Sequence, residues 1–160
     1  MGIITVTDEY TSPIPHTRIF KSLILDADNL IPKLLPQIIK GIEIVEGDGG
    51  AGTIKQMNFA EGTQFKSIKH RIDEIDVAKC IYNYTLIEGD ALGDKLEKIS
   101  YEAKFEASPE GGTISTMTSK YYVLDDAAIS EEEIKAGKEK AIGIYKAVEA
   151  YLLQNPHAYV

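Results

Sequence analysis

The chain has 160 residues, a length that suits one domain over residues 1–160 without a linker. It contains 25 acidic and 17 basic residues, which give a formal net charge of −8. We expect no nucleic-acid partner, because binding to a phosphate backbone requires a basic face that displaces counterions.

The sequence also lacks the signals of secretion, membrane insertion and metal binding. Cys80 is the single cysteine, so no internal disulfide can form. The N-terminus has neither the positive region nor the apolar run of a signal peptide, and no later segment has the length of a membrane span. The histidines, His16, His70 and His157, do not have metal-site spacing. We therefore expect a cytoplasmic protein with no membrane segment, no metal and no cofactor.

A strand and two short helices are predicted at the start of the chain. Residues 3–10 have strand character, and the prolines at 13 and 15 break that strand. Helical spacing then fits residues 17–25 and 28–35. We expect Pro32 and Pro36 to limit the second helix, because proline lacks the amide hydrogen that a helix interior uses.

A glycine-rich loop separates two predicted strands at 41–46 and 53–60. The loop consists of Glu46, Gly47, Asp48, Gly49, Gly50, Ala51 and Gly52. It resembles a phosphate-binding loop, but Thr53 follows where such loops carry lysine and the start of a helix. Glu46 and Asp48 would also place negative charge beside the phosphate. We therefore predict a rigid turn whose glycines allow positive φ and close packing.

Four further strands are predicted at 65–76, 79–88, 96–107 and 112–123. The clearest period of two lies in the third of these. One face carries Ile99, Tyr101, Ala103 and Phe105, and the other carries Lys98, Ser100, Glu102 and Lys104. Such a strand has one face in the core and one in water.

The C-terminal segment predicts one long amphipathic helix. Ser130 and Glu133 have capping-box spacing, and Asn155-Pro156 marks the end of the helix. At 100° per residue a single stripe contains Ile134, Gly137, Ala141, Ile144, Tyr145, Val148 and Leu152. This stripe should lie across the concave face of the sheet.

Small residues on that stripe leave two interpretations open. Gly137 costs about 1 kcal/mol relative to Ala in helix propensity and fills no space, and Ala141 one turn later is also small. Either the helix closely approaches the sheet, or a hollow lies between them. The tyrosines at 82, 84, 101 and 121 in strand segments favour the hollow, since phenols suit an apolar chamber with polar groups at its edge.

Five motifs in order give the chain a family resemblance. They are residues 26–33, the loop 46–53, residues 84–90, residues 96–99 and residues 135–140. Together they resemble the plant class-10 pathogenesis-related proteins, relatives of the major birch pollen allergen, from Gly2 to Tyr159. The resemblance implies an α+β fold, in which a seven-stranded antiparallel sheet wraps around a long C-terminal helix. Two short helices would close one end of a large internal cavity.

The resemblance also suggests which residues would bind a ligand. It implies that Lys55, His70, Tyr82, Tyr84 and Gly137 point inward beside ligands. Matching apolar lining positions are Leu23, Ile31, Ile39, Met57, Phe59 and Phe65; Tyr101 and Ala141 complete the set from the strand and helix patterns. Because Leu23 and Ile31 are Phe in the birch relative, its ligand preference does not transfer.

A carrier for amphiphilic small molecules, such as flavonoids, cytokinins or other hormones, is the favoured interpretation. The exposed loop at residues 43–53 is an antibody epitope in relatives, so allergenicity is implied by resemblance alone. Residues 88–93 occupy the gate position of related hormone receptors without the sequence of those gates. Nothing in the sequence requires an oligomer, so we expect a monomer.

Two enzymatic alternatives are weaker. Ribonuclease activity has been attributed to the family, at positions matching Glu97, Glu149 and Tyr151. Residues 149 and 151 lie about 200° apart around a helix, so their side chains do not readily converge on one phosphate. A cavity-based condensing enzyme of secondary metabolism is the second alternative. It would need Lys55 with a lowered pKa, which sequence alone does not reveal.

Overall fold

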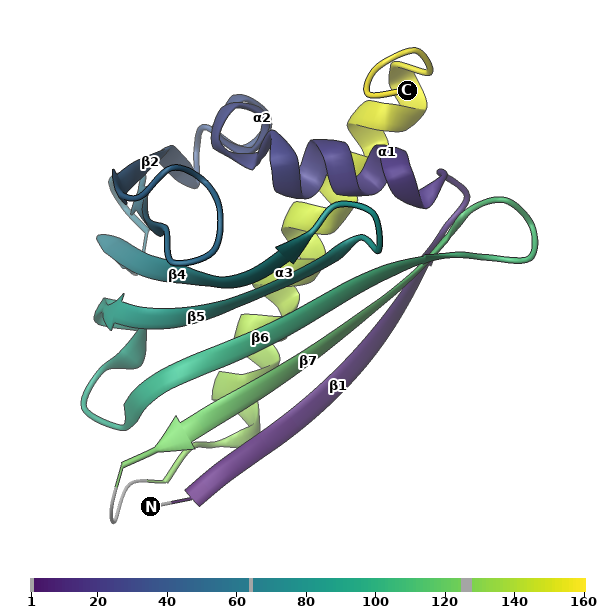
Figure 1. The fold of residues 1–160 in the computed structure, drawn as a ribbon. Coiled ribbons are helices and arrows are strands. Elements are labelled where there is room, and N and C mark those ends of the chain that lie inside the picture. Colours follow the sequence, from purple (N-terminus) through teal and green to yellow (C-terminus); the bar gives the residue numbers. More distant parts are fainter. Residues whose placement is uncertain (1, 64, 125–127) are drawn as a thin grey trace.

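The computed structural model describes residues 2–63, 65–124 and 128–160. Its seven strands are β1 (Gly2–Ser12), β2 (Ile39–Glu46), β3 (Ile54–Phe59), β4 (Ser67–Asp76), β5 (Ile81–Gly89), β6 (Leu96–Ala107) and β7 (Thr113–Val123). They form one antiparallel sheet in the order β1-β7-β6-β5-β4-β3-β2. The long helix α3 (Glu131–Gln154) crosses one face of this curved sheet (Figure 1). The predicted fold class is confirmed.

The alternation of apolar and polar residues along β6 shows which face of the sheet α3 covers. Ile99, Ala103 and Phe105 are buried, whereas Glu102 and Lys104 are exposed. β7 pairs with β6 so that Tyr121 lies opposite Ile99 and Ser119 opposite Tyr101. The inward residues of both strands therefore form one continuous surface beneath α3.

Short helices connect the two edge strands of the sheet. They are α1 (His16–Phe20), the π-helical segment η1 (Lys21–Leu25) and α2 (Ala27–Leu34); a 3₁₀ turn, η2 (Asp90–Leu92), follows β5. The first predicted helix is therefore an α-helical turn that continues into a π-helix. Figure 1 shows α1 beside the C-terminal end of α3.

The prediction that Pro32 limits the second helix is wrong. Pro32 lies inside α2, which ends at Leu34, before Pro36. The φ of proline is compatible with a helix, but its missing amide and its ring disturb the preceding turn, so other contacts must offset that cost. Leu30 and Ile31 are buried on this helix, and their packing supports the last turn.

The α3 helix begins as predicted. Ser130 is the N-cap, and its Oγ accepts a hydrogen bond of 3.1 Å from the Glu133 amide. Glu131, Glu132 and Glu133 occupy the first turn, where negative charge stabilises the positive end of the helix dipole. The α3 helix is not apolar enough to span a membrane, and neither is any other helix in the described part of the chain.

Two buried clusters form the core. One includes Leu86, Leu96 and Ile99 and is contacted by Ile134 near the start of α3, and the other lies at the C-terminal end of α3. Tyr145, Val148 and Leu152 are buried there in one cluster with Phe20 and Phe105. The Phe20 and Phe105 rings make an edge contact at 5.8 Å between centroids, which joins α1 to the end of β6. This cluster holds the C-terminal part of α3 against the sheet and leaves its N-terminal part to face a cavity.

Candidate ligand-binding site

A cavity of about 560 Å³ lies between the concave face of the sheet and the N-terminal part of α3. Every ligand-binding position predicted from the sequence lines it, except Ile39. The lining residues by element are Leu23 from η1, Ile31 from α2, Lys55, Met57 and Phe59 from β3, Phe65 from the β3–β4 connection, His70 from β4, Tyr82 and Tyr84 from β5, Tyr101 from β6, and Gly137 and Ala141 from α3. Side chains far apart in the sequence thus share one chamber.

The prediction that Ile39 lines the cavity is wrong. Ile39 is only 1% exposed and lies outside the cavity wall. Its amide donates a hydrogen bond of 2.8 Å to the Leu35 carbonyl, which holds it at the junction of α2 and β2. Strand β2 has a register shift between Ile39 and Gly41, and Ile42 lines the cavity instead.

Gly137 faces the cavity and does not mark a close contact between backbones. A Cβ placed there would have one heavy atom of the described residues within 4 Å, the Tyr121 hydroxyl oxygen at 3.4 Å. Of the two interpretations of Gly137, the hollow is therefore the one observed in this structure.

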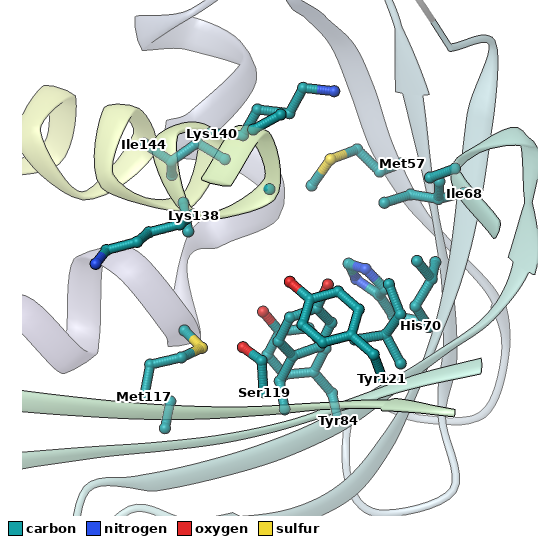
Figure 2. A pocket seen from close by; sticks show the side chains of 18 of the residues that line it. Met57, Ile68, His70, Tyr84, Met117, Ser119, Tyr121, Lys138, Lys140 and Ile144 are labelled. Atoms are coloured by element: carbon teal, nitrogen blue, oxygen red, sulfur yellow. The ribbon is translucent and has the colours of Figure 1, made fainter. Parts of the chain in front are cut away.

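A row of aromatic rings crosses the floor of the cavity. Tyr84 occupies its centre, with ring centroids 4.8 Å from His70, 5.1 Å from Tyr82 and 4.8 Å from Tyr101. The Tyr84 and Tyr101 rings are stacked, with 22° between their planes. Figure 2 shows Tyr84, Tyr121, Ser119 and His70 side by side on the sheet. The row provides flat apolar surface with polar atoms at its edge.

These polar groups are neutral near pH 7. Tyrosine phenols are protonated near neutrality in any case, and burial raises the pKa of Tyr84 and Tyr101 further. Burial also lowers the pKa of His70 to about 4, with a smaller contribution from the positive charge of Lys55. A neutral His70 can donate a hydrogen bond from one ring nitrogen and accept one at the other.

The His70 ring and the cavity tyrosine hydroxyls keep unused hydrogen-bond donors and acceptors. Across residues 2–63, 65–124 and 128–160, no protein group forms a hydrogen bond with the His70 ring or with the hydroxyls of Tyr82, Tyr84, Tyr101 and Tyr121. Among the described residues no fully buried side-chain N or O atom lacks a partner, so these atoms are accessible to solvent within the cavity. These atoms face the cavity, so a partner for them would have to lie inside it.

Strand β7 contributes lining residues that were not predicted as ligand-binding positions, although Tyr121 was among the tyrosines that favoured a hollow. Ser115, Met117, Ser119 and Tyr121 all line the cavity. They alternate along β7 with the period of two that was recognised in β6. The signal was therefore present, but small polar residues among them obscured it.

The glycine-rich loop has the geometry of a turn. The Gly49 amide donates to Thr53 Oγ1 at 2.8 Å, and the Gly50 amide to Asp48 Oδ1 at 3.0 Å. Gly47 has φ +98°, and a Cβ there would lie 2.7 Å from Thr53 Oγ1. Because the loop itself uses these amides, they are not oriented toward a phosphate.

The positions implied for a ribonuclease site lie apart. Glu97 is near the start of β6, and on the order of 25 Å of extended strand separates it from Phe105. Phe105 packs on α1, whose Arg18 donates to the Leu152 and Asn155 carbonyls at the end of α3. Glu149 and Tyr151 belong to this far end. None of the three implied positions lines the cavity.

The structure offers no evident metal site among its described residues, which contain no group of three or more His, Cys, Asp or Glu side chains able to hold an ion. The cavity wall carries tyrosines, His70 and several charged side chains beside its apolar residues. The Lys55 ammonium lies 2.8 Å from Asp28 Oδ1, so its charge is neutralised at the wall.

Comparison with known proteins agrees with this geometry. The chain is 57% identical to "Major allergen Pru ar 1" of Prunus armeniaca over 159 residues, 99% of each chain. The crystal structure of Ara h 8.0201 is 39% identical, covers 96% of this chain and 99% of its own, and has a TM-score of 0.88.

A norcoclaurine synthase from Thalictrum flavum, solved with dopamine and hydroxybenzaldehyde, shares the fold at a TM-score of 0.74 and 19% identity, with 96% of this chain and 88% of its own covered. Residues 1–155 match the model of the "Pathogenesis-related protein Bet v 1 family". The chain therefore belongs to that family.

Proposed function

We propose that this protein is a plant defence-related protein that binds and carries amphiphilic small molecules, such as flavonoids, cytokinins or other hormones, in its internal cavity. The observation that carries the proposal is the aromatic row, whose polar atoms have no protein partner among the described residues and which lies beside the apolar side chains of the cavity. Apolar walls would favour flat hydrocarbon surface, and the polar atoms would orient its substituents.

The expected affinity follows from the size and chemistry of this chamber. Burial of about 200 Å² of apolar ligand surface contributes roughly 5 kcal/mol. Each hydrogen bond to a tyrosine hydroxyl or to His70 adds about 1 kcal/mol. The entropic cost of association is subtracted from these contributions, so we expect moderate rather than tight binding. Several related ligands would then share the site.

We place this carrier in the cytoplasm as a monomer. Antibodies raised against allergenic relatives would be further partners, since the resemblance to Pru ar 1 extends over 99% of the chain. The exposed loop from Glu46 to Gly52 is the surface on which we would expect such antibodies to bind. Neither role requires a cofactor.

Ribonuclease activity is the alternative that receives less support. General acid–base cleavage needs two titratable groups within reach of one phosphate, and Glu97 lies far from Glu149 and Tyr151 along the sheet. A condensing enzyme would use the same cavity as a carrier. The binding experiment must therefore be accompanied by a measurement of turnover. Incubation with an amine and an aldehyde would reveal that activity as product formation.

The proposal is tested by titration with 8-anilino-1-naphthalenesulfonate, a fluorophore that brightens in apolar surroundings. Displacement by a flavonoid, a cytokinin and abscisic acid then ranks the ligands. We expect saturable uptake and competitive displacement by at least one of them, with RNA left intact in a parallel incubation. An absence of saturable uptake, or RNA cleavage without ligand binding, would contradict the proposal.

A further inference from the structure

Lysine is the only cationic residue type in the cavity wall as described, and the four lysines there differ in their partners. Three have an Nζ atom 2.6 to 2.8 Å from a carboxylate oxygen: Lys55 from Asp28, Lys95 from Glu133 and Lys138 from Asp8. Lys140 is the fourth, and within the described residues it forms no ion pair. Among the residues that the structure describes, the wall therefore presents one lysine charge that no carboxylate contacts directly.

The Lys140 ammonium contacts an aromatic ring. The Lys140 Nζ lies 4.0 Å from the centroid of the Phe65 ring, a cation–π contact. Lys140 is an exposed residue overall, but partial burial lowers its pKa, so its ammonium has lost a small part of its hydration. An anion at this position would replace that lost hydration with a charge-assisted hydrogen bond.

The neighbouring carboxylates do not pair with the Lys140 ammonium. Asp90 and Asp94 line the cavity, but neither is within ion-pair distance of Lys140. The Asp90 Oδ2 accepts a hydrogen bond of 3.0 Å from the Lys66 amide. Asp90 is therefore already bonded to the backbone next to Phe65.

The direction of the Lys140 side chain separates it from Lys138. Residues two apart on a helix leave its axis about 200° from each other. Figure 2 shows Lys138 and Lys140 on different sides of α3, with Lys140 toward the side where Met57 lies. Lys138 instead reaches Asp8 in the edge strand β1. The two lysines therefore lie on different sides of the cavity.

Apolar surface for a ligand body adjoins Lys140. The Phe59 and Phe65 rings lie 6.3 Å apart between centroids, and both line the cavity together with Met57. Their surface suits an aromatic or hydrocarbon body, while an acidic group on that body would reach the ammonium.

We propose that Lys140 makes this cavity selective for amphiphiles that carry one anionic group, with the apolar body against Phe59 and Phe65 and the anion at the Lys140 ammonium. The ligand class is that of aromatic carboxylates, sulfonates or phenolates. This inference rests on the proposed ligand-binding function and specifies which ligands the site prefers.

Two fluorophores of nearly the same shape test the inference. One is 8-anilino-1-naphthalenesulfonate, which is anionic, and the other is N-phenyl-1-naphthylamine, which lacks the sulfonate. Dissociation constants of both are measured for the parent protein, Lys140→Met, Lys140→Arg and the control Lys135→Met. Lys135 is an exposed lysine of the same helix that does not line the cavity, so the control removes the same charge from α3.

We expect Lys140→Met to weaken the sulfonate probe about three- to tenfold and to leave the neutral probe within about twofold. Lys140→Arg should keep the preference, and Lys135→Met should change neither constant. An unchanged sulfonate affinity in Lys140→Met would overturn the inference, as would an equal loss for both probes. If neither probe binds the parent protein saturably, the proposed function fails and this inference fails with it.

Discussion

The two halves of α3 differ in what they pack against. The C-terminal half, from Tyr145 to Gln154, buries Tyr145, Val148 and Leu152 against the helices and the sheet. The N-terminal half, from Glu131 to Ile144, contains no fully buried residue and instead lines the cavity with Gly137 and Ala141. One helix therefore anchors the fold at one end and forms a cavity wall at the other.

This difference shows how a small domain can remain stable around a hollow. Large apolar side chains are concentrated where the helix touches α1 and the end of β6. Small residues occupy the stripe where a ligand would need the space. Stability and binding should therefore respond to changes in different halves of the same helix.

The largest effect is expected in the C-terminal half, from Leu152→Ala. Leu152 is 0% exposed, so its truncation leaves a cavity in tight packing and should cost about 2–5 kcal/mol of unfolding free energy. Urea unfolding measures the change. The control is Leu153→Ala, because Leu153 is 57% exposed and should change stability by less than about 0.5 kcal/mol. Similar values for the two variants would contradict the assignment of the packed core.

His70 should make the cavity region sensitive to acid. The pKa of His70 is lowered to about 4 in the folded state, against about 6.5 in the unfolded chain. Above pH 6.5 both states are neutral, so the residue has no effect there. Between pH 6.5 and 4 only the unfolded chain takes up the proton, and stability should fall by up to about 3 kcal/mol.

Unfolding curves at several pH values, for the parent and for His70→Gln, measure this contribution by difference. The acidic residues titrate in both proteins, so their effect cancels in that difference. His157→Gln is the control, because His157 is exposed. If His70→Gln has the same pH dependence as the parent, His70 is not held neutral by burial.

A smaller effect, on binding, is expected in the N-terminal half from Gly137→Leu. The new side chain would start 3.4 Å from the Tyr121 hydroxyl and extend into the cavity, so probe affinity should fall by at least about tenfold. Stability should change by less than about 1 kcal/mol, since Leu is the better helix former. Fluorescence titration and urea unfolding measure the two quantities.

Gly143→Leu is the matched control for that variant. Gly143 lies on the same helix, is exposed, and has no described atom within 4 Å of an added Cβ. It should gain the same helix propensity and keep full probe affinity. Equal binding by the two leucine variants would contradict the claim that ligands occupy the space beside Gly137.

Much of this arrangement could be predicted from local sequence patterns. The period of two in β6, the capping residues Ser130 and Glu133, and the stripe on α3 each depend on neighbours a few positions apart. The family resemblance then placed Lys55, His70 and Tyr84 on a common wall, and the structure has them there.

The predictions that were wrong or missing depend on contacts between residues far apart in the sequence. Pro32 fits inside α2, and a register shift in β2 places Ile42 on the wall while Ile39 packs beside α2. The partners of Lys138 and Lys140 could not be assigned from the sequence, since Asp8 and Phe65 lie far from them along the chain. Ion pairs and ring contacts across strands have no local sequence signal.

The most direct test of the central claim is methyl NMR of the protein labelled at methionine and isoleucine methyl groups, titrated with the best displacing ligand. Met57 and Met117 line the cavity, and Ile19 lies in the packed core at 1% exposure. The account predicts saturable shifts of the Met57 and Met117 methyls, little change at Ile19, and loss of the shifts in Gly137→Leu. Binding that leaves both cavity methionines unshifted would contradict the account, because the ligand would then lie outside the cavity.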